Sequence, residues 1–189
     1  ILTQLFECRT AIAQAGIGQI KSLDQTITRM GAIAKMWRTG NGNFAHFHGG
    51  GIPDSERIDD GVKRCGPPGK VTRHAKQTGF LRLSSGRTTL IMDCSAPIRP
   101  LPENSASLGS FEVHLAGTPF IVNVGQLSED RLLNEAFCQT AAHTALTLDN
   151  LNNFFWRNNK YNPVKVLQIG PATGGMLVKL SHDGYGESH

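Results

Sequence analysis

The sequence lacks the features that mark membrane-spanning, zinc-ribbon or disulfide-framework proteins. No apolar run approaches the roughly 20 residues that a membrane-spanning helix needs. The four cysteines, Cys8, Cys65, Cys94 and Cys138, lie far apart and form no CxxC pair, which excludes a zinc ribbon and leaves disulfides without support. Charged residues make up only 18% of the chain and hydrophobic residues 39%. That balance is typical of a folded domain rather than a disordered chain.

Common catalytic signatures are also absent. The sequence has no Gly-x-Ser-x-Gly elbow, no phosphate-binding loop and no HExxH helix. Its two tyrosines are Tyr161 and Tyr185, and neither stands in a recognisable catalytic motif. Any enzymatic activity must therefore rest on residues that these motifs do not contain.

The excess of positive charge is small, with a formal net charge of +4. Basic residues are densest between 57 and 87, where they could meet an anionic partner such as an acidic polysaccharide or a nucleic acid. No aromatic side chain interleaves the charges from 57 to 79, and single-stranded nucleic acids bind through such stacking platforms. A solvated loop is the better interpretation, and nucleic-acid binding is not expected.

The first 39 residues have a helical pattern. Apolar residues recur at helical spacing over 1–14, Gly16 and Gly18 interrupt the run, and Ser22 opens a second helical stretch. Residues 40–78 are predicted to be a glycine-rich loop or linker without elements of its own, because the pattern fails there. The helical pair cannot bury much surface by itself, so it must belong to something larger.

From residue 79 the hydrophobic period changes to two. Hairpins are predicted at 80–83 with 88–93, at 110–115 with 120–124 and at 164–169 with 176–180, a short helical piece at 129–137 and a further strand at 144–148. Alternation predicts Glu112 and His114 on the opposite face from Phe111 and Val113. The sequence thus predicts a mainly β fold, an antiparallel β-sandwich over 79–189 after a short α-helical segment over 1–39. The chain starts without methionine and ends in GYGESH, so we expect the sandwich to be truncated.

Two histidines in the segment GNGNFAHFHGGG are candidates for substrate binding. On a strand, residues i and i+2 point to one side, so His46 and His48 could converge on a metal or an anionic sugar. The glycines that follow would allow a ligand to approach the backbone closely. The alternative is a structural loop that Phe44 and Phe47 anchor.

The segment SHDGY places His182, Asp183 and Tyr185 close together after the last predicted strand. A histidine and a tyrosine can transfer protons or stack on a sugar ring, which makes His182 and Tyr185 candidate catalytic residues. Asp-Gly is also a common turn signal, and a structural turn is the favoured interpretation.

Several segments in order, GFLRLSSGRTTLIMD, SASLGSFEVHLAGTPFIVNVG, AAHTALTLDN and SHDGY, resemble the C-terminal half of the heparinase II/III family. The resemblance implies that residues 1–39 are the last helices of an α/α toroid and that the rest is a β-sandwich. It also implies a polysaccharide lyase that cleaves acidic, uronate-containing glycans such as glycosaminoglycans by β-elimination. In that family a tyrosine base with histidine help lies largely on the toroid, so we expect the base outside this chain and the chain alone to be inactive.

The same resemblance implies a place for zinc in the sandwich, held by two histidines and an aspartate. Ser105 stands at the first histidine position, Asn123 at the aspartate position, and only His143 matches. One imidazole, one hydroxyl and one amide are poor zinc ligands, so no metal and no other cofactor is expected. His143 is predicted to be an orienting hydrogen-bond group.

The losses at Ser105 and Asn123 also support an alternative of a different class. The chain could be a non-catalytic module, either a glycan-binding or a purely structural β-sandwich. Sugar-selective binding would support the glycan interpretation, whereas equal, salt-sensitive binding to heparin and DNA would indicate non-specific electrostatics.

Overall fold

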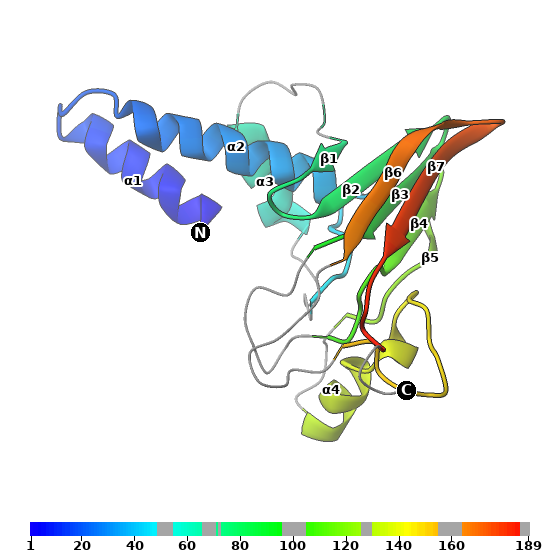
Figure 1. The fold of residues 1–189 in the computed structure, drawn as a ribbon. Coiled ribbons are helices and arrows are strands. Elements are labelled where there is room, and N and C mark those ends of the chain that lie inside the picture. Colours follow the sequence, from blue (N-terminus) through cyan, green and yellow to red (C-terminus); the bar gives the residue numbers. More distant parts are fainter. Residues whose placement is uncertain are drawn as a thin grey trace.

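The computed structural model describes residues 1–48, 55–65, 71, 73–95, 105–125, 130–154 and 164–185. The helices are α1 (Leu2–Gln14), α2 (Lys21–Trp37), α3 (Ser55–Arg64), α4 (Arg131–Phe137) and the 3-10 helix η1 (Thr140–Ala142). Helices α1, α2 and α3 lie together at one end beside the strands, and α4 lies apart from them, beyond the lower ends of the strands (Figure 1). The strands are β1 (His74–Ala75), β2 (Phe80–Ser85), β3 (Thr88–Asp93), β4 (Phe111–Leu115), β5 (Thr118–Ile121), β6 (Lys165–Ala172) and β7 (Gly175–Ser181). No helix among these residues is both long and apolar enough to cross a membrane.

Helices α1 and α2 form the expected antiparallel pair, and α3 packs against both (Figure 1). Phe6 of α1 is 1% exposed and lies beneath the guanidinium groups of Arg9 and Arg64, 5.2 and 4.6 Å from its ring centroid. Gly31 of α2 allows the close approach of α3, because a methyl group there would lie 2.6 Å from the Cys65 side chain. The helical segment is thus a three-helix unit rather than a pair.

The interval 40–78 corrects one expectation, since it contains both α3 and β1. The sequence of α3, SERIDDGVKR, places Ile58 and Val62 four positions apart, at helical spacing, but two apolar residues are too few to predict a helix from a hydrophobic pattern. Charge pairs hold it instead: Asp60 pairs with Arg64 one turn later, and Asp59 pairs with Arg38 at the end of α2.

The first sheet has five antiparallel strands in the order β1-β2-β3-β4-β5. The β2–β3 hairpin closes through a two-residue turn, Gly86-Arg87, because Ser85 pairs with Thr88. Its buried core joins the sheet to the helices, since Phe80 and Ile91 pack with Met36 of α2 and with Phe47. The side chain of Arg82 adds a polar link by donating to the Met36 and Arg38 carbonyls at 2.9 and 2.5 Å.

The alternation predicted for β4 is confirmed, but its buried face is the polar one. Glu112 and His114 are 1% and 3% exposed, whereas Phe111 and Val113 are half-buried. The reason is that Glu112 is tied by hydrogen bonds to two neighbouring backbone segments and to His114. The polar face of β4 is therefore an internal hydrogen-bonding surface.

The β6–β7 hairpin lies across one face of the five-stranded sheet (Figure 1). A second core cluster lies between the two layers, where Val178 and Leu180 of the hairpin pack with Leu81 of β2 and Met92 of β3. This confirms the two-layer antiparallel arrangement. The expected mainly β class needs correction, because the helices make up too large a part of the described fold. The fold is mixed, with helices first and antiparallel sheets after.

One predicted strand does not form, and the predicted end of another is wrong. No strand forms over 144–148, where Leu148 makes only an isolated bridge to Leu151. The Thr144 side chain bonds the Phe111 carbonyl instead, so this segment is held by side-chain contacts rather than by a ladder. Strand β5 ends at Ile121, two residues before Asn123.

Candidate functional site

The segment between α2 and α3 carries His46 and His48 to the inner strands of the sheet, where they meet Glu112 of β4 and Asp93 of β3. It is not a strand, although Arg38 and Phe44 form an isolated bridge and Ala45 donates to the Trp37 carbonyl at 3.1 Å. Phe47 anchors it in the core, with its ring 5.3 Å from that of Phe80. Because the backbone is not a regular strand, the simple i, i+2 rule does not decide where the two histidines point.

His46 and His48 attach to different carboxylates. His46 uses its backbone N–H, which donates to Glu112 Oε1 at 2.9 Å. His48 uses its ring, whose Nε2 lies 2.8 Å from Asp93 Oδ2. The backbone of His48 has φ +52°, a left-handed conformation that few non-glycine residues adopt.

The carboxylate that meets His48 is itself held firmly. Asp93 is 2% exposed, at the end of β3, and its Oδ1 accepts the backbone N–H of Ser95 at 2.8 Å. The Ser95 hydroxyl lies 3.3 Å from the same His48 nitrogen. The edge of the His48 ring meets Phe80, with centroids 6.2 Å apart and planes at 89°. This is a histidine–aspartate dyad in a half-buried setting.

The dyad favours a charged imidazole. Burial of the His48 ring disfavours its charge, but the hydrogen bond to Asp93 and the negative charge of that carboxylate outweigh burial. The pKa of His48 is therefore raised above its usual value of 6.5.

The raised pKa of His48 predicts a pH-dependent contribution to stability. A group whose pKa is higher in the folded state stabilises that state fully below its unfolded pKa, near 6.5, and loses this effect as the pH rises through the folded value. We expect the difference in free energy of unfolding between the wild type and Asp93→Asn to be largest in acid and to shrink toward alkaline pH. Urea titrations from pH 5 to 9 measure it, and a difference that grows with pH would contradict it.

His143 lies within electrostatic range of the dyad. It follows η1, and neither of its ring nitrogens, both shielded from solvent, has a hydrogen-bond partner of good geometry among the described residues. Burial lowers the pKa of His143, the Phe137 carbonyl opposes that shift, and the charges of His48 and Asp93 act on the ring in opposite directions. The fold thus gathers His48, Asp93 and His143 into one region.

Ser105 and Asn123 are occupied by internal hydrogen bonds. The Ser105 hydroxyl lies 3.1 Å from that of Ser107. The side-chain oxygen of Asn123 accepts the backbone N–H of Thr144 at 3.1 Å, while its amide nitrogen is buried without a partner in the described part of the chain. His143 is then the one good zinc donor of the three, so this set does not fit zinc. Within the described ranges, no three His, Cys, Asp or Glu side chains converge in a way that could hold a metal ion.

The C-terminal candidates contact a different loop. The Tyr185 hydroxyl donates to the Leu146 carbonyl at 2.6 Å and accepts the Leu148 N–H at 3.3 Å. His182 Nδ1 accepts the Gly184 N–H at 3.2 Å, and burial lowers the pKa of this histidine. These contacts hold the turn after β7, and a catalytic role for His182 or Tyr185 stays a prediction. Tyr161 lies outside the described residues.

A thiol beside the dyad offers no nucleophile. Cys94 follows Asp93 and is 5% exposed. Burial, reinforced by the negative charge of Asp93, raises the pKa of the Cys94 thiol to about 12. The thiolate, which is the reactive form, is therefore scarce near neutral pH.

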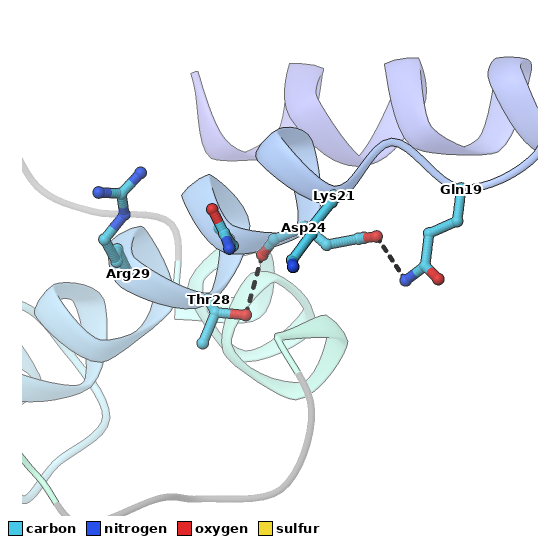
Figure 2. Close-up of a pocket in the computed structure, with 6 residues that line it drawn as sticks. Gln19, Lys21, Asp24, Thr28 and Arg29 are labelled. Carbon is cyan, nitrogen blue, oxygen red and sulfur yellow. Dashed lines mark hydrogen bonds between the residues drawn. The ribbon is translucent and has the colours of Figure 1, made fainter.

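A groove of about 630 Å³ lies at the far end of the helical unit (Figure 2). It is lined by Gln19, Lys21, Asp24, Gln25, Thr28 and Arg29. Asp24 already accepts from Gln19 at 2.7 Å, and its carbonyl accepts from Thr28 at 2.9 Å. The other lining residues are exposed to solvent. The groove lies at the protein surface, is lined by polar and charged residues, and includes neither residue of the dyad.

Sequence comparison identifies the family to which this chain belongs. Residues 67–189 match the family described as Heparinase II/III-like, C-terminal. The chain belongs to this family, which confirms the resemblance noted in the sequence. No curated protein matches the chain in sequence.

Solved structures of similar fold include a heparinase and a heparan sulfate lyase. A structure described as heparinase III has a TM-score of 0.75 and 14% identity, with 98% of this chain and 34% of that chain covered. The heparan sulfate lyase HepC from Pedobacter heparinus has a TM-score of 0.70 and 17% identity, with 98% and 33% covered. A mutant of that lyase has a TM-score of 0.61 and 19% identity, with 88% and 30% covered. The chain thus spans about a third of their length, and at these identities the likeness shows the fold alone.

Proposed function

We propose that this chain is the C-terminal part of a polysaccharide lyase that cleaves acidic, uronate-containing glycans by β-elimination. Membership of the heparinase II/III-like family and the lyase folds that resemble it support this assignment. The observation that carries it is the His48–Asp93 dyad, with His143 close by, at the junction between the helices and the sheet.

The chemistry of β-elimination explains what such a dyad contributes. A base removes the proton next to the uronate carboxylate, and negative charge builds up on that carboxylate in the transition state. A histidine whose pKa is raised supplies positive charge and a hydrogen-bond donor there. His48 would stabilise the developing charge, and His46 beside it would contact the sugar.

The described residues include no good candidate for the catalytic base. The Tyr185 hydroxyl donates a hydrogen bond to the Leu146 carbonyl, so this tyrosine could act as a base only if that hydrogen bond were broken. We therefore place the base in sequence that the solved relatives have beyond this third of their length. On the same grounds we propose that α1 and α2 are the last helices of a toroid that walls the substrate cleft.

The test is an absorbance assay for the unsaturated uronate that β-elimination creates. This chain and the longest available version of the protein are each incubated with a panel of acidic polysaccharides. We expect activity in the longer version only, and a loss of about 100-fold in His48→Ala, the size seen when one oxyanion-stabilising donor is removed. His74→Ala, which changes a histidine of the edge strand β1 that has no part in the dyad, is the matched control.

A non-catalytic, glycan-binding or structural module is the second candidate. It is favoured by the internal hydrogen bonds that occupy Ser105, Asn123 and Tyr185. The longer version would then show no lyase activity on any polysaccharide but would bind one of them selectively. That result would replace the lyase assignment with this one.

A further inference from the structure

We propose that Asp93 is a positioning residue that fixes the ring of His48 so that its Nδ1 faces the carboxylate of an acidic sugar. This inference rests on the proposed lyase function for its substrate class. It goes further in naming a residue outside the candidates that the sequence yields, and in assigning separate tasks to the two ring nitrogens.

The contacts around the ring distinguish its two nitrogens. Nε2 meets Asp93 Oδ2 at 2.8 Å and the Ser95 hydroxyl at 3.3 Å. A proton therefore resides on Nε2, where a carboxylate and a hydroxyl can accept it. No described residue bonds Nδ1, and the His48 side chain is 33% exposed. Nδ1 is thus the nitrogen that an external ligand can reach.

Asp93 is itself rigid enough to orient a histidine. Its side chain is 3% exposed, and its second oxygen is held by the backbone N–H of Ser95. It ends β3, whose pairing with Phe80 of β2 fixes its backbone. The ring of His48 also has Phe80 at its edge, so it cannot swing freely away from the carboxylate.

The unusual backbone of His48 supports a functional purpose for this arrangement. A left-handed conformation at a non-glycine residue persists where the surroundings impose it, and such residues concentrate at ligand sites. Here Phe47, buried in the core, and Asp93 impose it from either side. The other titratable ring that acts on this pair is His143, whose nitrogens are shielded from solvent.

The first test is nitrogen NMR of the histidine rings in this chain, which requires no activity. We expect the neutral His48 ring of the wild type, observed at a pH above its pKa, to hold its proton on Nε2, and Asp93→Asn to lower the pKa of that ring and mix the tautomers of its neutral form. Asp183→Asn is the matched control, because Asp183 is an exposed aspartate that acts on a different histidine, His182. An unchanged His48 ring in Asp93→Asn would overturn the proposal.

The second test adds a ligand. A uronate-containing oligosaccharide should shift the Nδ1 signal of His48, whereas a neutral oligosaccharide of the same length should not. Equal shifts with both, or no shift with either, would overturn the assignment of Nδ1.

A double-mutant cycle separates positioning from a purely structural role. In the longest active version, Asp93→Asn should lower kcat/KM about tenfold in the wild-type background and leave it unchanged in the His48→Ala background. Additive losses would overturn the positioning role while leaving the lyase assignment intact. Absence of lyase activity would overturn the proposed function instead, and the NMR result would still decide how His48 is held.

Discussion

Replacing Glu112 with alanine should destabilise the folded chain by about 3 kcal/mol or more, because leaving a buried donor without its acceptor costs about 1–3 kcal/mol and Glu112 serves several donors. Glu112 is 1% exposed, and its Oε1 accepts the backbone N–H groups of His46 and Asn123 at 2.9 and 3.2 Å. Its Oε2 lies 3.2 Å from His114 Nε2. Alanine would leave three buried donors without an acceptor, and water cannot easily reach them.

The loss should be measured as the free energy of unfolding in urea, followed by circular dichroism. Two controls separate charge from surface effects. Glu112→Gln keeps an oxygen acceptor for the two backbone donors, so it should cost less than alanine. Glu135→Ala removes an exposed partner of Arg131 and should leave stability close to that of the wild type. If Glu112→Ala were as mild as Glu135→Ala, the buried face of β4 would not be the internal network described.

The hairpins of this fold could be predicted from sequence because their signals are local. Alternation over a few residues and a Gly-containing turn define β2–β3, and the same signals define β6–β7. In α1 and α2 the apolar residues likewise recur at helical spacing, and glycines mark the break between the two helices. Family membership was also recognisable, because it rests on the order of such local segments.

Other elements depend on contacts that no local pattern encodes. Helix α3 contains only two apolar residues at helical spacing, and its ion pair to Arg38 appears only once the chain has turned back. The segment after His143 has strand-like composition, yet Thr144 bonds Phe111 and Asn123 through its side chain and leaves no ladder to form. Tertiary structure overrides local preference at both places.

The residues of the candidate site also divide into those that the sequence indicates and those that only the tertiary fold brings together. His46 and His48 could be chosen because they form a short motif of chemically versatile side chains, and His143 because the family resemblance points to its position. Asp93 could not, since it lies 45 positions from His48 and its role follows from the tertiary fold that brings them together. A small signal was present, in that Asp93 ends a predicted apolar strand and is followed by a cysteine and a serine in an apolar context.

The glycine that shapes this site should tolerate substitution poorly. Gly79 has φ +78°, and a Cβ there would lie 2.6 Å from the backbone nitrogen of Ser95. Its carbonyl also accepts the Cys94 N–H at 2.7 Å, so it cannot move away without breaking that bond. We expect Gly79→Ala to cost about 3 kcal/mol or more, since a left-handed alanine and a backbone overlap add together.

Gly86 provides the matched control in the same sheet. It also has a positive φ, +55°, but no atom lies within 4 Å of the position where a Cβ would be built. Gly86→Ala should therefore cost only the conformational penalty of about 1–2 kcal/mol. Urea unfolding of both variants measures the difference, and the His48 ring signal reports whether Ser95 and Asp93 have moved. If the two variants lost the same free energy of unfolding, the backbone at Ser95 would have to move easily. The rigid support inferred for Asp93 would then be wrong.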